Sequence, residues 1–136
     1  MRRGGAAAAA LAVAAGLVAC GSQTEDLMAI DVTHGGIIGS HYKIRMTNDG
    51  RGSCGGPLEQ LPSQLLLDAR EVKRALRPLA RRGASFLGSG PNAQHYEVRT
   101  FDGVVRWDAR PGIPPAVGRA TLLTLRLERR LCRRGG

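Results

Sequence analysis

The sequence predicts an α+β fold, a small antiparallel sheet of four to five strands with two helices packed on one face. In several short segments apolar residues alternate with polar ones, as in half-buried strands. Two longer segments carry apolar residues at helical spacing, and turn-forming residues separate all of these segments. A chain of 136 residues that is 43% apolar has room for one core of modest size.

The first nineteen residues predict a secretory signal peptide. A basic start with Arg2 and Arg3 precedes residues 6–19, which are only Ala, Leu, Val and Gly. At about 1.5 Å per residue these fourteen residues extend roughly 21 Å, which is short for a hydrocarbon core of ~30 Å. We therefore expect residues 1–19 to be removed on export, residues 20–26 to form a spacer, and residues 27–136 to form one domain.

Residues 17–21, with Cys20 preceded by a small residue, resemble the bacterial lipobox. The resemblance implies that the thiol of Cys20 carries a diacylglycerol and that the domain is held on the extracytoplasmic side of the cell membrane. Acyl chains bind a bilayer with about 0.8 kcal/mol per buried methylene, which is enough for stable anchoring. The alternatives are an ordinary secreted protein with a chance cysteine at this position, or a start codon placed too far upstream.

Cys54 and Cys132 remain as an even pair once Cys20 is assigned to lipid. In an oxidising compartment such a pair predicts a disulfide. Closing a loop of this length stabilises a fold by roughly 4 kcal/mol in the chain-entropy model. Two free thiols are the alternative. A metal site is disfavoured because neither cysteine has a second Cys or His at ligand spacing.

The charge is strongly positive and comes mostly from arginine. The formal net charge of +9 falls to +7 when Arg2 and Arg3 leave with residues 1–19. Four arginines, at positions 70, 74, 77 and 81, fall on one face of a predicted helix, and four more lie within residues 129–134. An exported protein rarely meets nucleic acid, so anionic lipid head groups or an anionic envelope polymer are the expected partners. An ordinary solvated face is the alternative.

Period-two alternation predicts strands over residues 28–33 and 42–47, the second closed by a turn at residues 48–50. Residues 51–62 are rich in Gly and Pro and are expected to form an irregular strand or a loop. Residues 96–99 and 105–108 alternate on either side of a turn at residues 101–103, which predicts a hairpin. Trp107 shares the inward alternation of Val105 and is expected in the core.

Two segments predict helices. Asp68 and Glu71 form a start like a capping box, after which apolar residues recur at helical spacing. Pro78 is expected to kink this helix or to end it near Arg77. The last segment, from Pro115 to residue 131, fits a helical stripe, although residues 123–127 alone alternate like a strand. We favour the helix.

Motifs that carry catalysis are missing from the sequence. It has no HExxH, no GxSxG and no GxxxxGK[ST], so we expect no enzyme and no cofactor. His34, His41 and His95 each fall on a predicted strand or at its end and are expected to face solvent. His41 and His95 are candidates to face each other across the sheet, but two imidazoles without a placed carboxylate are a weak metal site.

Several short motifs, in order, resemble the emfourin-like family of small bacterial α+β domains. They are an apolar strand that leads into a Gly-Gly turn (32–36), a strand that ends in Asn-Asp-Gly, a Leu-spaced helix opening at 67–71, the strand 95–98, and Pro114-Pro115 before a terminal helix. The resemblance covers residues 29–131 and implies a function like that of the family's namesake, which inhibits thermolysin-type metallopeptidases. It assigns no inhibitory residue, and Cys54 and Cys132 are not part of its pattern.

Two loops beside strand ends are the candidate contact surface of a binding or inhibitor domain. They span residues 35–40 and 88–93, and an exported peptidase is one possible partner. The residues singled out in them are Gly35, Gly36, Gly39, Ser89 and Asn92.

Overall fold

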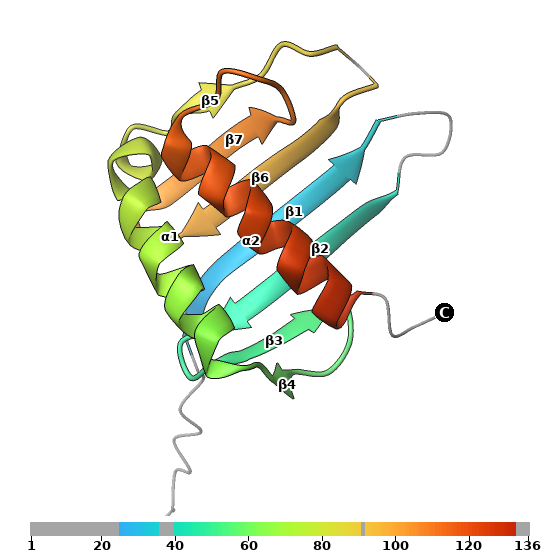
Figure 1. Cartoon of the computed structure of the whole chain (residues 1–136), viewed down its shortest axis with the longest axis vertical. Helices are drawn as coiled ribbons and strands as arrows, with labels where there is room; N and C mark the ends of the chain where they lie inside the picture. Colours follow the sequence, from blue (N-terminus) through green and yellow to red (C-terminus); the bar gives the residue numbers. More distant parts are fainter. Residues whose placement is uncertain (1–24, 36–39, 91, 133–136) are drawn as a thin grey trace, which may run out of the picture.

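The structure, a computed structural model, describes residues 25–35, 40–90 and 92–132 and has the α+β class that the sequence predicts. Within these residues a single mixed sheet is accompanied by two helices (Figure 1). The strands are β1 (Asp26–His34), β2 (His41–Thr47), β3 (Arg51–Cys54), β4 (Glu59–Gln60), β5 (Ser85–Phe86), β6 (Gln94–Thr100) and β7 (Gly103–Asp108), and the helices are α1 (Ser63–Arg81) and α2 (Pro115–Leu131).

The sheet has seven strands in the described part of the chain, so the prediction of four to five was wrong. Their order is β4-β3-β2-β1-β6-β7-β5. All neighbours are antiparallel except β5 and β7, which are parallel. Residues 51–62, expected to form an irregular strand or a loop, contain β3 and β4, whereas β5 was not predicted; β4 and β5 have two residues each. A strand of that length is too short to show any alternation.

The two faces of the sheet differ sharply. On one face the inward side chains of β1, β2, β6 and β7 form the core with apolar residues of both helices. Figure 1 shows α1 and α2 in front of this face. The other face carries charged and polar side chains such as Asp31, Lys43, Glu97 and Arg106, and no helix of the described chain covers it in this view. We call it the open face.

Helix α1 begins five residues earlier than predicted. It starts at Ser63 after Pro62, and no side chain caps it. Asp68 is therefore no cap; its carboxylate accepts from Arg126 of α2 at 2.6 Å. Pro78 lies inside the helix and does not end it, because the next turn still buries Ala80 in the core. Packing of that turn offsets the hydrogen bond that proline cannot make.

The last segment is a helix, as favoured from the sequence. Helix α2 buries Val117, Ala120, Leu123 and Leu127 along one stripe. Trp107 is fully buried, as predicted, and its indole N–H donates to Thr121 Oγ1 at 2.9 Å. Neither helix in the described residues is long and apolar enough to span a membrane.

Cys54 and Cys132 form a disulfide, which confirms the predicted pair. Their Cα atoms are 5.2 Å apart, and the bond joins β3 to the residue that follows α2. The closed loop spans 78 residues and includes both helices and four of the seven strands.

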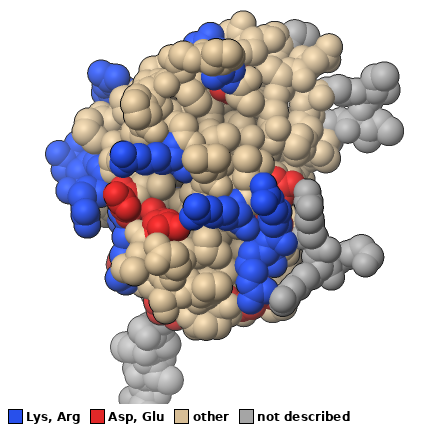
Figure 2. Space-filling model, in the orientation of Figure 1, with Lys and Arg blue, Asp and Glu red and all other residues tan. Residues whose placement is uncertain are grey.

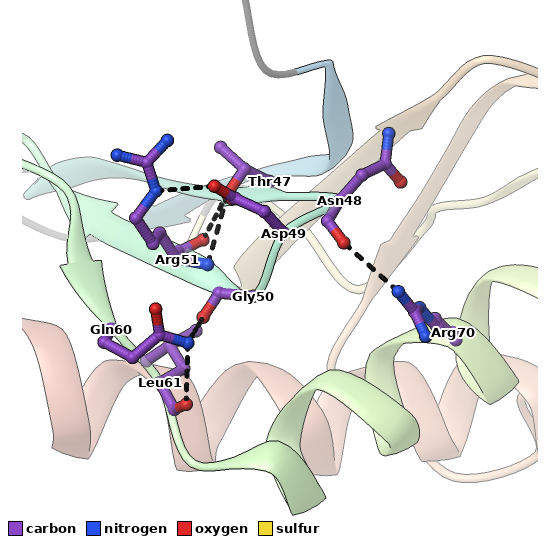
Figure 3. Close-up of polar contacts among 8 residues, drawn as sticks. All are labelled: Thr47, Asn48, Asp49, Gly50, Arg51, Gln60, Leu61 and Arg70. Carbon is purple, nitrogen blue, oxygen red and sulfur yellow. Dashed lines mark hydrogen bonds and ion pairs between the residues drawn. The ribbon is translucent and has the colours of Figure 1, made fainter.

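The central strands run between two ends of the sheet, which carry different connections. At the turn end lie the start of β1, the β2–β3 turn and the β6–β7 turn. At the loop end lie Gly35, Ser40 and residues 87–90 and 92–93, beside the end of β7. Helix α1 passes along the turn end, where Arg70 Nη2 donates to the carbonyl of Asn48 at 3.2 Å (Figure 3).

The β2–β3 turn confirms the predicted Asn-Asp-Gly closure. Gly50 takes a φ of +86°, a conformation that favours glycine. The buried Thr47 hydroxyl donates to the Asp49 carboxylate, which also accepts from Arg51 Nε at 2.8 Å (Figure 3). The Thr47 hydrogen bond and the adjacent Arg51 hold the pKa of Asp49 below its ordinary value.

Candidate binding surface at the loop end

The two candidate loops meet at the loop end of the sheet. The backbone N–H of Gly35 donates to the carbonyl of Ala93 at 3.3 Å, which joins the residue after β1 to the residue before β6. The N–H of His34 donates to Ser40, so the first loop is also closed at its base. Segments far apart in the sequence thus contribute to one surface.

The predicted site residues have different outcomes. Gly35 and the exposed Asn92 lie on either side of this junction. Ser89 lies over the end of β7. Its backbone N–H donates a hydrogen bond to the Asp108 carboxylate, and its side chain is exposed. Gly36 and Gly39 lie outside the described residues, as does Cys20.

Asp108, the last residue of β7, organises the second loop. Its carboxylate is fully buried, and Oδ2 accepts from the backbone N–H groups of Gly88 (2.8 Å) and Ser89 (2.7 Å). Burial alone would raise the pKa of Asp108. The hydrogen bonds from Ser89, Gly88 and His95 outweigh that cost and hold its pKa below the ordinary value.

His95 Nδ1 lies against the other oxygen of Asp108. An ionised carboxylate can only accept a hydrogen bond, so Nδ1 must carry the proton of this contact. In the neutral ring, Nε2 is then left as an acceptor. The side chain of His95 is 37% exposed, so it forms part of the surface while Asp108 is hidden beneath the loop.

A second histidine on the open face also has a carboxylate partner. His41 Nε2 lies 3.1 Å from Asp31 Oδ1, and Lys43 Nζ lies 3.8 Å from the same oxygen. The sequence analysis expected no placed carboxylate beside either histidine, and that expectation was wrong. His41 and His95 both pair with Thr33, from opposite sides, so β1 separates them on the same face.

These groups surround an open-face hollow of about 560 Å³ next to the loop end. The Glu97 carboxylate at its border accepts from Arg106 at 2.8 Å and from Arg99 at 2.9 Å. Leu87, which is 47% exposed, is its apolar wall. The residues that line the hollow are Asp31, Thr33, His41, Leu87, His95, Tyr96, Glu97 and Arg106.

The hollow offers groups for binding in the form of imidazoles, carboxylates and a guanidinium. Thr33 stands between the two histidines, but its hydroxyl makes no hydrogen bond to either ring within the described residues. An assembled nucleophile and base would need that contact. In the same part of the chain no group of three His, Cys, Asp or Glu side chains is placed to hold a metal ion.

Sequence reasoning missed Asp108 and its contact with His95, although a signal was present. A two-residue connection at Phe101 and Asp102 makes Thr100 pair with Gly103, and the same register places His95 opposite Asp108. Residues that pair across an antiparallel ladder point to the same face. The contact of Asp108 with Gly88 and Ser89 has no comparable signal, because it depends on the path of the loop after β5.

No family model matches the chain, and no curated protein or solved structure matches it. The resemblance to the emfourin-like family therefore stays a prediction, and so does the lipobox.

Proposed function

We propose that the chain is a lipid-anchored extracytoplasmic domain that works by binding and not by catalysis. Cys20 carries the acyl group, and residues 1–19 are the export signal. The disulfide between Cys54 and Cys132 supports an oxidising compartment, because such bonds persist mainly outside the cytosol.

The observation that carries the proposal is the placement of the two ends of the sheet. The described chain enters at Glu25, beside the turn end, where the Glu25 carbonyl accepts from Asn48 N at 2.9 Å. From there β1 runs nine residues to the loop end, and at ~3.3 Å per residue this is about 30 Å. An anchor at Cys20 therefore leaves the two loops and the open-face hollow at the end remote from the membrane.

A partner at the loop end meets both a hydrogen-bonded pair of loops and the hollow beside them. This surface suits an exported protein or peptide, because three charged side chains, two imidazoles and apolar groups share the hollow and can meet a mixed polar and apolar surface. The protein is in this view an accessory or binding domain of the cell envelope, without a cofactor.

The second candidate function is inhibition of an exported thermolysin-type metallopeptidase, as the emfourin-like resemblance implies. The observation in its favour is the junction of Gly35 with Ala93, which makes one contact surface from two loops. Stoichiometric inhibition in a panel of such peptidases, lost on Asn92→Ala, would support it. Absence of inhibition across the panel would remove it and leave the binding domain.

Metabolic labelling with an alkyne fatty acid tests the anchor. We expect the full chain to be labelled and to sediment with membranes, and Cys20→Ser to lose both properties. Cys54→Ser is the matched control, since it removes a cysteine elsewhere and should keep the label. A label that survives in Cys20→Ser, or an unlabelled full chain, would contradict the proposal.

A further inference from the structure

Phe101 is the most exposed large apolar residue of the described chain. It lies at the tip of the β6–β7 turn, and its side chain is 95% exposed. The turn beneath it is well held, because Thr100 Oγ1 accepts from the backbone N–H of Asp102 at 3.2 Å. The Asp102 carboxylate in turn contacts Arg77 and Arg81 of α1. A rigidly presented aromatic ring inserts into an interface at little entropic cost.

Basic side chains of α1 gather on the side of the helix that faces the same turns. The cationic side consists of Arg70, Lys73, Arg74, Arg77 and Arg81. Figure 2 shows one group of Lys and Arg side chains along the α1 flank and a second group over the middle and lower right of this face, where α2 runs. The acidic residues of α1 point instead toward α2, where Asp68 contacts Arg126 and Glu71 contacts Arg119. The acidic neighbours of the cationic side at the turn end are Asp102, which contacts Arg77 and Arg81, and Glu25 and Asp26, which line a hollow with Lys73.

The entry point of the chain lies beside Phe101. Glu25, Lys73, Arg99 and Phe101 line one hollow of about 750 Å³ at the turn end. Asp26 borders it as well, with its carboxylate 2.6 Å from Arg45 Nε. One exposed aromatic ring, two basic residues and two acidic residues thus lie together where the chain enters the domain, and aromatic and basic groups are the ones that favour a membrane interface.

The length of the spacer limits how far this surface can be from lipid. This step rests on the proposed function, in which Cys20 is acylated. Glu25 follows Cys20 by five residues, and a fully extended chain spans at most about 3.6 Å per residue. Glu25 is therefore held within about 18 Å of the anchor, which keeps the turn end close to the bilayer.

From these observations we propose that the turn end docks on an anionic phospholipid bilayer. Phe101 enters the head-group region, and the cationic side of α1 contacts lipid phosphates. The anchor supplies proximity, and the docking fixes the orientation in which the loop end points away from the membrane.

The experiment uses the full, lipidated chain in vesicles of phosphatidylcholine and phosphatidylglycerol with brominated acyl chains, which quench nearby indoles. In Phe101→Trp we expect quenching several-fold greater than in the matched control Leu87→Trp, at the loop end. Trp107 is common to both variants and is buried. Lys73→Ala/Arg74→Ala in the Phe101→Trp background should reduce the quenching, whereas Arg119→Ala/Arg129→Ala on α2 should not.

The outcomes separate the two proposals. A chain that floats with the vesicles but shows equal quenching in Phe101→Trp and Leu87→Trp would overturn the docking and leave the anchor. A chain without an acyl group, which does not float, would overturn both. Retention on an anionic wall polymer in place of quenching would overturn the bilayer as the partner. Near-equal unfolding free energies for Phe101→Trp and the parent chain would show that the substitution acts on the surface alone.

Discussion

The turn end and the loop end of the sheet are each stabilised by a different kind of interaction. At the turn end, backbone packs on backbone, since a Cβ built on Gly103 would lie 2.2 Å from the carbonyl oxygen of Ala80 in α1. At the loop end, the buried Asp108 carboxylate holds the loop after β5 in place, because it accepts hydrogen bonds from two backbone N–H groups of that loop and from His95. Steric packing does not depend on pH, whereas a buried charge does. The end proposed to face the membrane is thus held in part by close backbone packing, and the end proposed to meet a partner is held by a buried charge.

Removal of the disulfide should have the largest effect on stability and should destabilise the turn end and the loop end alike. The disulfide belongs to neither end, because Cys54 pairs with Ile44 in the middle of β2. We expect Cys54→Ser/Cys132→Ser to lower the free energy of unfolding by about 4 kcal/mol, since the unfolded chain regains the entropy of a long loop. Urea denaturation gives the value, and hydrogen exchange should rise at both ends together. Faster exchange at one end only would mean that the disulfide supports that end locally.

A glycine substitution should act on the turn end alone. Gly103 has a φ of +137° and approaches Ala80 too closely for a side chain. We expect Gly103→Ala to cost about 3 kcal/mol from backbone strain and displacement of α1. Gly112→Ala is a control with positive φ (+81°) and open space around the built Cβ, and it should cost less. Equal losses in the two variants would contradict the role of close packing.

A carboxylate substitution should act on the loop end and depend on pH. We expect Asp108→Asn to cost about 2 kcal/mol near neutral pH, because bonds to a charged acceptor are lost. The pKa of Asp108 is lowered in the folded state, so its stabilisation is present above the unfolded value of about 3.9. It is lost as the pH falls through the folded value.

The difference between the parent chain and Asp108→Asn should therefore shrink as the pH falls below about 4. Urea denaturation at a series of pH values measures it. Asp49→Asn is the control at the turn end, where an exposed carboxylate should give a smaller loss. A difference for Asp108→Asn that stays constant down to low pH would refute the electrostatic account of the loop end.

Those parts of the fold that depend on periodicity were predictable from the sequence. The alternation of apolar and polar residues around Ile30, Ile44 and Val98 correctly predicted their strands. In α2 the apolar stripe at helical spacing correctly outweighed the short strand-like alternation of residues 123–127. The start of α1 was not predictable from a capping side chain, because the helix begins at Ser63 after Pro62 without one, and Asp68 instead contacts α2. The residues around Asp68 in the sequence do not show that its side chain will contact another helix.

The candidate site was predictable only in outline. The loops at Gly35 and Asn92 could be proposed because they follow or precede strands, but their junction depends on β1 and β6 being neighbours. The contact between Asp31 and His41 crosses from β1 to β2, and Asp108 is buried by a loop and not by its strand. Such contacts follow from strand order, which hydropathy does not encode.

The outermost strands of the sheet, β4 and β5, have two residues each in the described chain. An unpaired strand edge is a template for pairing with another molecule, and natural proteins blunt it by keeping edge strands short. A protein tethered by lipid, as proposed, is concentrated in two dimensions with its copies in similar orientation, which favours edge-to-edge contact between copies. The two-residue edge strands have little backbone of their own to pair with a neighbour, which disfavours edge-to-edge association between anchored copies.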